Sequence, residues 1–145
     1  MGGLNPGQAA LFYNEAIQAS MDQWGITDAT AIAAYLARPE VAYQGGTAGL
    51  TQIAIQKWIA LFGDGGNAWF EWRRTCQPST IAAGPAATED FVPRRFYYSQ
   101  TEVSVNGANV DAAITDQGAD NFGTRIWWDK PANAPTCAGV NLNLP

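Results

Sequence analysis

The twenty residues QKWIALFGDGGNAWFEWRRT (56–75) join an apolar run, a Gly-Asp-Gly-Gly segment at 63–66, and a second run rich in tryptophan and arginine. Glycines permit positive φ, so the chain can leave one helix and enter the next at a sharp angle. Trp69 and Trp72 lie three residues apart on one helix face, from which they can pack back on the first helix. The stretch therefore predicts a structural corner between two helices rather than a catalytic loop.

The sequence up to residue 75 predicts four helices, three of which begin before the corner. Asn5 and Pro6 form a good N-cap and first turn, and Gly25 can end that helix. A second helix is expected after Thr27 or Asp28, ending at Arg38-Pro39. Thr47 is expected to cap a third helix, and a fourth runs from about Asn67 to Thr75. The third helix should bury the residues at helical spacing, which are Leu50, Ile53, Ala54, Trp58, Leu61 and Phe62.

The amino-acid composition of the chain changes at Cys76. Residues 76–95 are rich in Pro, Ala, Gly and Thr, as in an extended connection. Residues 94–106 show short β-like runs, 108–117 can form a short helix ended by Gly118, and 124–129 look extended. The predicted fold class is mainly α. Helical hairpins over residues 1–75 are followed by an irregular, loop-rich segment over 76–145, with short strands and one short helix.

The composition of the chain limits the classes of function that it can have. The 145 residues are 47% apolar, enough for one domain with a real core. Only 14% are charged and the net charge is −5, which argues against nucleic acid as a partner. The absence of histidine removes the commonest general base and metal ligand. Two cysteines cannot make a zinc site, so Cys76 and Cys137 are either buried thiols or a disulfide.

No catalytic pattern stands out. A glycosidase needs two facing carboxylates, and none of the thirteen acidic residues forms a pair marked by its spacing. Glu71 lies among aromatics, but such a residue more often pairs with an arginine one turn away. The glycines at 63–66 match no phosphate-binding loop, and DQGADNFG (116–123) does not fit an EF-hand. We therefore predict no enzyme, no cofactor and no metal site.

Five stretches in the same order resemble proteins of the SusD/RagB family, the starch-binding outer-membrane lipoproteins of Bacteroidota. They are the corner at 56–75 together with YNEAIQASMDQWGI, YLARPEVAY, PRRFYYSQTEVSVNGANVDAAI and FGTRIWWDK. Together they cover about residues 11 to 130. The resemblance is to the C-terminal part of a longer protein, so residues 1–145 are expected to be a single domain or a fragment that keeps part of an α-α superhelix.

The resemblance implies a non-catalytic glycan- or nutrient-binding protein at the cell-surface side of the outer membrane. Its expected partners are a SusC-like TonB-dependent transporter, an oligosaccharide or other nutrient, and the missing N-terminal part of the same protein. The lipid anchor is expected on a part of the parent protein outside this chain. The alternative is a SusD-derived structural subunit that docks on a protein partner and binds no sugar.

The resemblance also bears on single residues. The shared motifs look structural, so Trp58, Trp69, Trp72, Trp127 and Trp128 are expected in the core, and Trp24 likewise. The candidate ligand contacts are the freer residues Tyr43, Tyr97, Tyr98 and Arg95, although Arg94 and Arg95 can instead anchor the chain through carboxylates or carbonyls. Where the family usually has glycine, this sequence has Cys76, which favours a disulfide with Cys137.

Overall fold

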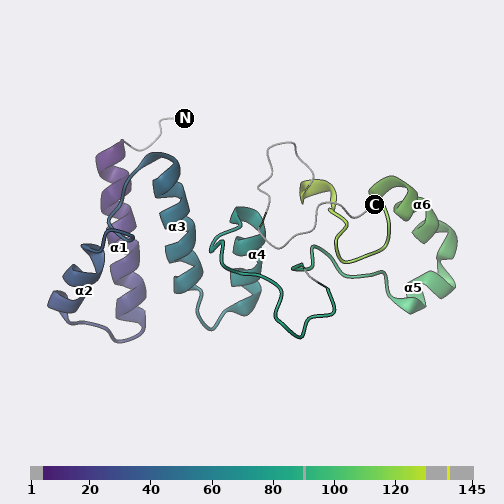
Figure 1. The fold of residues 1–145 in the computed structure, drawn as a ribbon, viewed down its shortest axis with the longest axis horizontal. Helices are drawn as coiled ribbons and strands as arrows, with labels where there is room; N and C mark the ends of the chain where they lie inside the picture. Colours follow the sequence, from purple (N-terminus) through teal and green to yellow (C-terminus); the bar gives the residue numbers. More distant parts are fainter. Residues whose placement is uncertain (1–4, 90, 130–136, 138–145) are drawn as a thin grey trace. The chain divides into compact units, whose positions relative to one another are not determined.

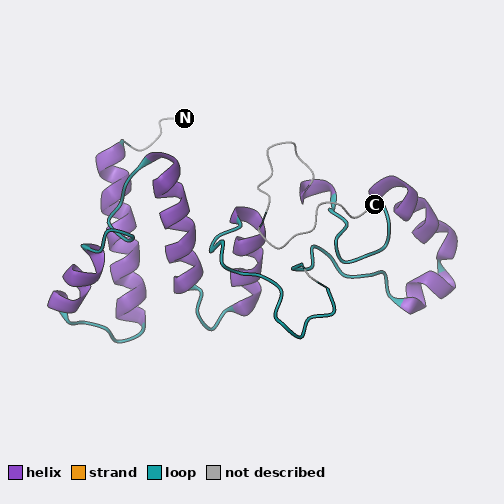
Figure 2. Cartoon of the chain, viewed as in Figure 1, coloured by secondary structure: helices purple, strands orange, loops and turns teal. Residues whose placement is uncertain are grey.

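The computed structural model describes residues 5–89, 91–129 and 137. Within these residues the chain is mainly helical, as predicted, and Figure 2 shows no strand among them, so the predicted short strands are wrong. Two compact units divide the chain, Met1–Pro78 and Ser79–Pro145. Whether residues 1–145 are a single domain or a fragment stays a prediction.

The first unit contains four helices, which Figure 1 labels α1 (Pro6–Gln23), α2 (Ala29–Leu36), α3 (Gly46–Ala60) and α4 (Gly65–Thr75). Helix α1 packs against both α2 and α3, and α3 packs against α4. The second unit contains α5 (Gln100–Val105), α6 (Gly107–Gln117) and a 3₁₀ turn at Trp127–Asp129. Helices α5 and α6 follow each other directly and pack together.

The first two helices begin where the sequence predicts. The Asn5 side chain accepts a hydrogen bond from the Gln8 backbone N–H at 2.9 Å, and the Gln8 side chain accepts one from the Asn5 N–H at 3.2 Å. This reciprocal capping box satisfies two N–H groups that the helix itself leaves without partners. Asp28 caps α2 by accepting from the N–H of Thr30 at 2.8 Å.

Helix α3 differs from its prediction in its cap and in its buried face. Its N-cap is Gly45, at φ 71°, and Thr47 lies inside the helix, so the predicted Thr47 cap is wrong. Gly49, Gln52 and Ala54 are buried, whereas Leu50, Ile53 and Phe62 are exposed, Phe62 by 75%. The helix turns its small and amide side chains toward the neighbouring loop, and much of its apolar surface is left uncovered by the rest of the unit.

The core of the first unit lies between α1 and the loop that follows α2. Tyr13, Ile17 and Val41 are buried together, and the Tyr13 hydroxyl donates to the Val41 carbonyl at 2.8 Å. Gln52 of α3 holds the same loop. Its amide donates to the carbonyls of Glu40 and Ala42 at 3.2 and 2.9 Å and accepts from the Gln44 N–H at 2.9 Å. These hydrogen bonds explain why a polar side chain is buried here.

The corner at 63–66 is structural, as predicted. Gly63 has φ 88°, and Asp64 caps α4 by accepting from the Asn67 N–H at 3.2 Å. Trp69 and Trp72 stack with ring centroids 5.9 Å apart. Glu71 is buried and ties the two helices together, because Lys57 of α3 pairs with it at 2.9 Å and Arg74 of α4 also pairs with it.

Helix α4 is followed by its C-cap, Cys76. Cys76 has φ 55°, in the left-handed region that favours glycine. It is disulfide-bonded to Cys137, as predicted. The disulfide offers a reason for a cysteine at a backbone position where glycine would be less strained.

Two tryptophan predictions fail in the second unit. Trp127 and Trp128 are expected in the core but are exposed, Trp127 by 82%. In the 3₁₀ turn they occupy, only Asp129 is buried, because its carboxylate turns inward to Arg94. The predicted β-like run at 94–106 is likewise wrong at its end, since Ser99 caps α5 by accepting from the Glu102 N–H at 3.1 Å.

Candidate functional site

Three of the four predicted ligand residues meet in the second unit. The segment before α5 carries Arg95, Tyr97 and Tyr98, and the loop after α6 carries Asp120 and Phe122. The two segments are joined by the Arg94 N–H, which donates to the Phe122 carbonyl at 2.7 Å. We refer to the side chains gathered here as the Arg95 cluster, which consists of Arg95, Tyr97, Tyr98, Gln117, Asp120 and Phe122.

Arg95 is the centre of this cluster. Its Nη2 pairs with Asp120 Oδ1 at 2.9 Å, and its Nε donates to the Phe96 carbonyl at 2.9 Å. The guanidinium lies over the Tyr98 ring, 4.6 Å from the ring centroid. The side chain is only 8% exposed, and its Nη1 has no hydrogen-bond partner among the described residues. Arg95 thus anchors its segment to a carboxylate, as predicted, and keeps one unused donor.

The tyrosines of the cluster differ in their environment. Tyr98 is held from both ends, because its backbone N–H donates to the Asp120 carboxylate at 3.2 Å and its hydroxyl accepts from Gln117 Nε2 at 3.0 Å. Tyr97 is 48% exposed and meets Phe122 edge to face, with centroids 4.4 Å apart. An aromatic ring that is held at one edge and open to solvent suits stacking against an apolar ligand face.

A buried ion pair fixes the start of the same segment. Arg94 has no exposed surface, and its Nε donates to Asp129 Oδ2 at 2.8 Å while Nη2 pairs with Oδ1. Its Nη1 donates to the Cys137 Sγ at 3.3 Å. This arrangement uses the planar, forked geometry of the guanidinium, which matches a carboxylate through two parallel hydrogen bonds. Arg94 therefore has a structural role next to the open residues of the cluster.

The fourth predicted residue, Tyr43, does not join the others. It lies in the first unit, where its ring packs on Tyr13 with centroids 5.2 Å apart. It also presses on α3, because a Cβ added to Gly49 would come within 2.8 Å of the Tyr43 ring. A Gly-rich loop next to Tyr43 suggests a solvent-facing side chain. The sequence does not indicate that Gly49, which has no side chain, leaves room for the Tyr43 ring on α3.

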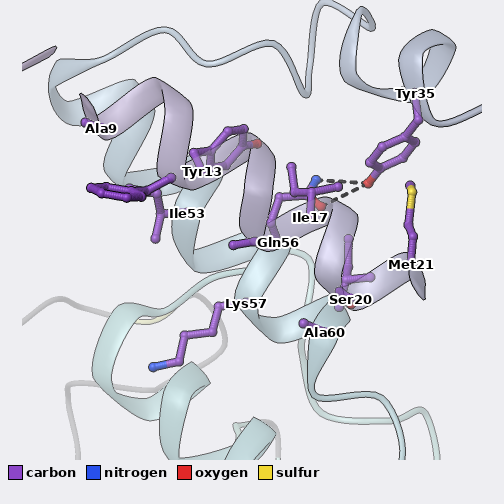
Figure 3. A pocket seen from close by; sticks show the side chains of 13 residues that line it. Ala9, Tyr13, Ile17, Ser20, Met21, Tyr35, Ile53, Gln56, Lys57 and Ala60 are labelled. Atoms are coloured by element: carbon purple, nitrogen blue, oxygen red, sulfur yellow. Dashed lines mark hydrogen bonds between the residues drawn. The ribbon is translucent and has the colours of Figure 1, made fainter. Parts of the chain in front are cut away.

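A second candidate surface is an apolar groove in the first unit, with a cavity of about 430 Å³. Figure 3 shows its lining on α1 and α3, with Tyr13, Ile17 and Met21 on one side and Ile53 and Ala60 on the other. Its volume falls in the range of small-molecule pockets. We call this cavity the α1–α3 groove.

The chemistry of the α1–α3 groove does not suit a sugar. Two of its polar groups bond to each other, since Gln56 Nε2 donates to the Tyr35 hydroxyl at 2.9 Å and that hydroxyl lies 3.1 Å from Gln56 Oε1 (Figure 3). Lys57 at its margin pairs with Glu71. A sugar brings many hydroxyl groups that need partners, and burying them without partners is unfavourable. The groove suits an apolar occupant such as a helix face.

The carboxylates near the aromatics are not arranged for acid catalysis. Burial by itself would raise the pKa of Glu71, but hydrogen bonds and charge from Arg74 and Lys57 outweigh it and lower the pKa below its ordinary value. A glycosidase acid needs a raised pKa, so Glu71 lacks that property. Asp120 and Asp129 are each paired with an arginine. Among the described residues, no group of three or more cysteine, aspartate or glutamate side chains could hold a metal ion.

Comparison with known proteins agrees with the resemblance seen in the sequence. A SusD-like family described as starch-binding and associating with the outer membrane matches residues 2–99. No curated protein matches the chain significantly. In the part of the chain that the structure describes, none of the helices is both long enough and apolar enough to cross a membrane.

Three solved structures are similar to this chain. A SusD-like protein of Bacteroidetes AC2a is 26% identical, with a TM-score of 0.78 over 90% of this chain. A chitin-binding SusD homologue from Flavobacterium johnsoniae is 31% identical, with a TM-score of 0.68 over 92%. A further chitin-binding protein is 27% identical, with a TM-score of 0.68 over 84%. The chain spans only 27%, 33% and 28% of their respective lengths.

Proposed function

Because the chain belongs to the SusD-like family, we propose that it binds a glycan at the cell surface without transforming it. Proteins of this family are in general non-catalytic binding proteins. Two of the similar solved proteins are chitin-binding, and the family description is starch-binding. These relatives support carbohydrate binding as the class of function.

The observation that carries the proposal is the Arg95 cluster. It combines an open aromatic face on Tyr97 with fixed polar groups on Arg95, Tyr98 and Asp120. A sugar ring presents an apolar face of C–H groups and a rim of hydroxyls, so it needs this combination of aromatic and polar groups. The pairing of Arg95 with Asp120 also fixes the cluster before a ligand arrives, which reduces the entropy lost on binding.

Two partners follow from the family. The bound glycan would be handed to a SusC-like TonB-dependent transporter in the outer membrane. The protein would act on the cell-surface side of that membrane. The α1–α3 groove would be covered by a helix from the remainder of the full-length protein. The similar solved chains are about three times as long as this one, and the groove is apolar enough to receive such a helix.

Affinity electrophoresis through gels that contain soluble polysaccharides tests the proposal. The disulfide-bonded chain is run in gels containing starch, glycol chitin or hydroxyethyl cellulose, with serum albumin as the non-binding control. We expect retardation in at least one gel and no release of reducing sugar during the run. Unretarded migration in every gel, with capture of a protein partner, would favour the docking role without sugar. Release of reducing sugar would indicate a hydrolase.

A further inference from the structure

The chain is exposed and irregular just after the boundary between the two units. Residues 84–88, with the sequence Gly-Pro-Ala-Ala-Thr, are all exposed, and so is Ala82. The described residues 79–89 lie outside every helix, and the Ala87 N–H donates to the Gly84 carbonyl at 2.9 Å to close a single turn. Exposed loop tips made of small residues are the places where folded proteins are most readily cut by proteases.

Exposure alone does not make a segment cleavable, because the backbone must also leave its native contacts to enter a protease. Ala42, in the loop after α2, is exposed as well. However, its carbonyl accepts from the Gln52 amide at 2.9 Å, and its N–H donates to the Arg38 carbonyl at 2.8 Å. In the part of the chain that the structure describes, residues 84–88 are held only by the hydrogen bond of their own turn. Opening this turn is therefore easier than opening the loop at Ala42.

Both ends of the exposed segment are fixed to buried residues. Before it, the buried Trp72 donates from Nε1 to the Pro78 carbonyl at 3.2 Å. After it, Phe91 and Val92 are buried in turn. A break between these anchors leaves the residues on either side in their native contacts, so the helices need not unfold when the segment is cut.

The disulfide encloses this segment, because Cys76 precedes it and Cys137 follows it. One cut inside the ring therefore gives two chains that remain covalently joined. Both cysteines are buried, and Arg94 Nη1 donates to the Cys137 sulfur at 3.3 Å. A reductant reaches a buried disulfide slowly, so the covalent link should outlast the cut.

We propose that residues 82–88 are a cleavage site for an endoprotease of the elastase type, whose small S1 pocket accepts alanine, and that the cut protein persists as a disulfide-linked two-chain form. At the Ala87–Thr88 bond, for example, hydrolysis breaks the C–N bond. The oxygen of water becomes part of a new carboxylate on Ala87, and Thr88 gains a free amino group. A trypsin-like enzyme has no site in this segment, since no lysine or arginine stands between Arg74 and Arg94.

This inference does not depend on which ligand the protein binds. After the cut, the disulfide is the one covalent link between the first unit and the unit that carries the Arg95 cluster. Cleavage followed by reduction would remove that link, whereas either step alone would leave the two units covalently joined.

Limited digestion of the full chain with elastase tests the inference, with the cut located by mass spectrometry. We expect the first cut between residues 82 and 88, one band in a non-reducing denaturing gel and two bands after reduction. Circular dichroism of the cut, unreduced protein should show the same helical signal as the intact protein. The triple variant Ala82→Asp, Ala86→Asp and Ala87→Asp should be cut at least about tenfold more slowly, because a charged side chain is unfavourable in an apolar S1 pocket.

Ala42→Asp is the matched control, since it changes an exposed alanine in the loop held by Gln52 and should leave the rate of the first cut within about twofold. A first cut at Ala42 or inside a helix would overturn the inference, and so would an unchanged rate in the triple variant. Loss of the helical signal on cutting, or two bands without reductant, would overturn the two-chain form. The position of the cut in the wild-type protein decides the cleavage site even if the triple variant folds poorly.

Discussion

Arg94 and Asp129 form a doubly hydrogen-bonded ion pair in which the arginine side chain has no exposed surface. The pair lies next to the Arg95 cluster in sequence, and Arg94 also contacts the Cys137 sulfur. Removing one member of a buried ion pair leaves the other charge without compensation, and such a charge is far more unfavourable than a lost surface pair.

Asp129→Ala should therefore destabilise the protein by about 3–5 kcal/mol. The measurement is the midpoint of urea unfolding at pH 7, followed by circular dichroism. The double variant Arg94→Met with Asp129→Leu is the control, because it removes both charges and fills the space with apolar side chains. It should recover at least half of the loss. A loss below about 1 kcal/mol for Asp129→Ala would mean that water reaches the pair.

The left-handed conformation of Cys76 gives a prediction about the disulfide. The disulfide closes a loop of about 60 residues, and Cys137→Ser should lower stability by about 4 kcal/mol in the chain-entropy model. In that background Cys76→Gly should be more stable than Cys76→Ala by about 1 kcal/mol, because glycine adopts positive φ without strain. Thermal unfolding of the three variants gives the comparison. A more stable alanine variant would show that the helix end relaxes once the disulfide is gone.

The effect of Gly49→Ala on the stability of the protein should change sign when the Tyr43 ring is removed. Alanine is favoured over glycine inside a helix by about 1 kcal/mol, but a Cβ at position 49 would lie 2.8 Å from the Tyr43 ring. Overpacking of this kind amounts to about 1–3 kcal/mol, so Gly49→Ala should destabilise the wild-type protein. In a Tyr43→Ala background the clash is absent, and the same change should stabilise by about 1 kcal/mol. A double-mutant cycle from urea unfolding measures both values, and additivity would show that the ring moves aside freely.

Glu71 should make stability depend on pH in the acid range. Its pKa is lower in the folded protein than its ordinary value of 4.5, so the folded state binds fewer protons and stability increases with pH across this range. The contribution is fully present above about pH 4.5 and is lost as the pH falls through the folded pKa. Its partners Lys57 and Arg74 are largely exposed, so we expect only about 1 kcal/mol.

The measurement is the free energy of unfolding between pH 3 and 7 for the wild-type protein and Glu71→Gln. The difference between the two should shrink as the pH falls, since protonated glutamate and glutamine are similar in shape and charge. A constant difference across the range would show that the ion pairs with Glu71 contribute nothing.

The helices of the first unit could be predicted from local signals in the sequence. Asn5, Asp28 and Asp64 are capping residues that act through neighbours only two or three residues away, so the sequence contains the whole interaction. The same holds for the Glu71–Arg74 pair one turn apart. Helix α5 is hard to predict from the sequence, because Val103 and Val105 favour a β-strand while Ser99 favours the start of a helix.

The buried face of α3 and the surface of the second unit could not be predicted in this way. Leu50 and Phe62 follow helical spacing, yet spacing shows only which residues share a face and not whether another element covers it. Trp127 is expected in the core because it lies in a motif shared with the family, but the inward turn of Asp129 toward Arg94, 35 residues away, determines which side chain of that 3₁₀ turn is buried. For the candidate site, Arg95, Tyr97 and Tyr98 are neighbours in sequence and stay predicted ligand contacts, whereas their contact with Asp120, more than 20 residues away, depends on the fold.

The measurement that tests most directly whether a sugar is held at the Arg95 cluster is titration calorimetry of Tyr97→Ala with chitohexaose and maltohexaose. Removing the open ring should weaken the better of the two ligands at least about tenfold, because a central aromatic contact carries a large share of binding energy. Tyr97→Phe keeps the ring, and Phe70→Ala removes another exposed ring, on α4 in the other unit. Both should bind within about threefold of the wild-type protein. Unchanged affinity in Tyr97→Ala, or an equal loss in Phe70→Ala, would contradict binding at this cluster.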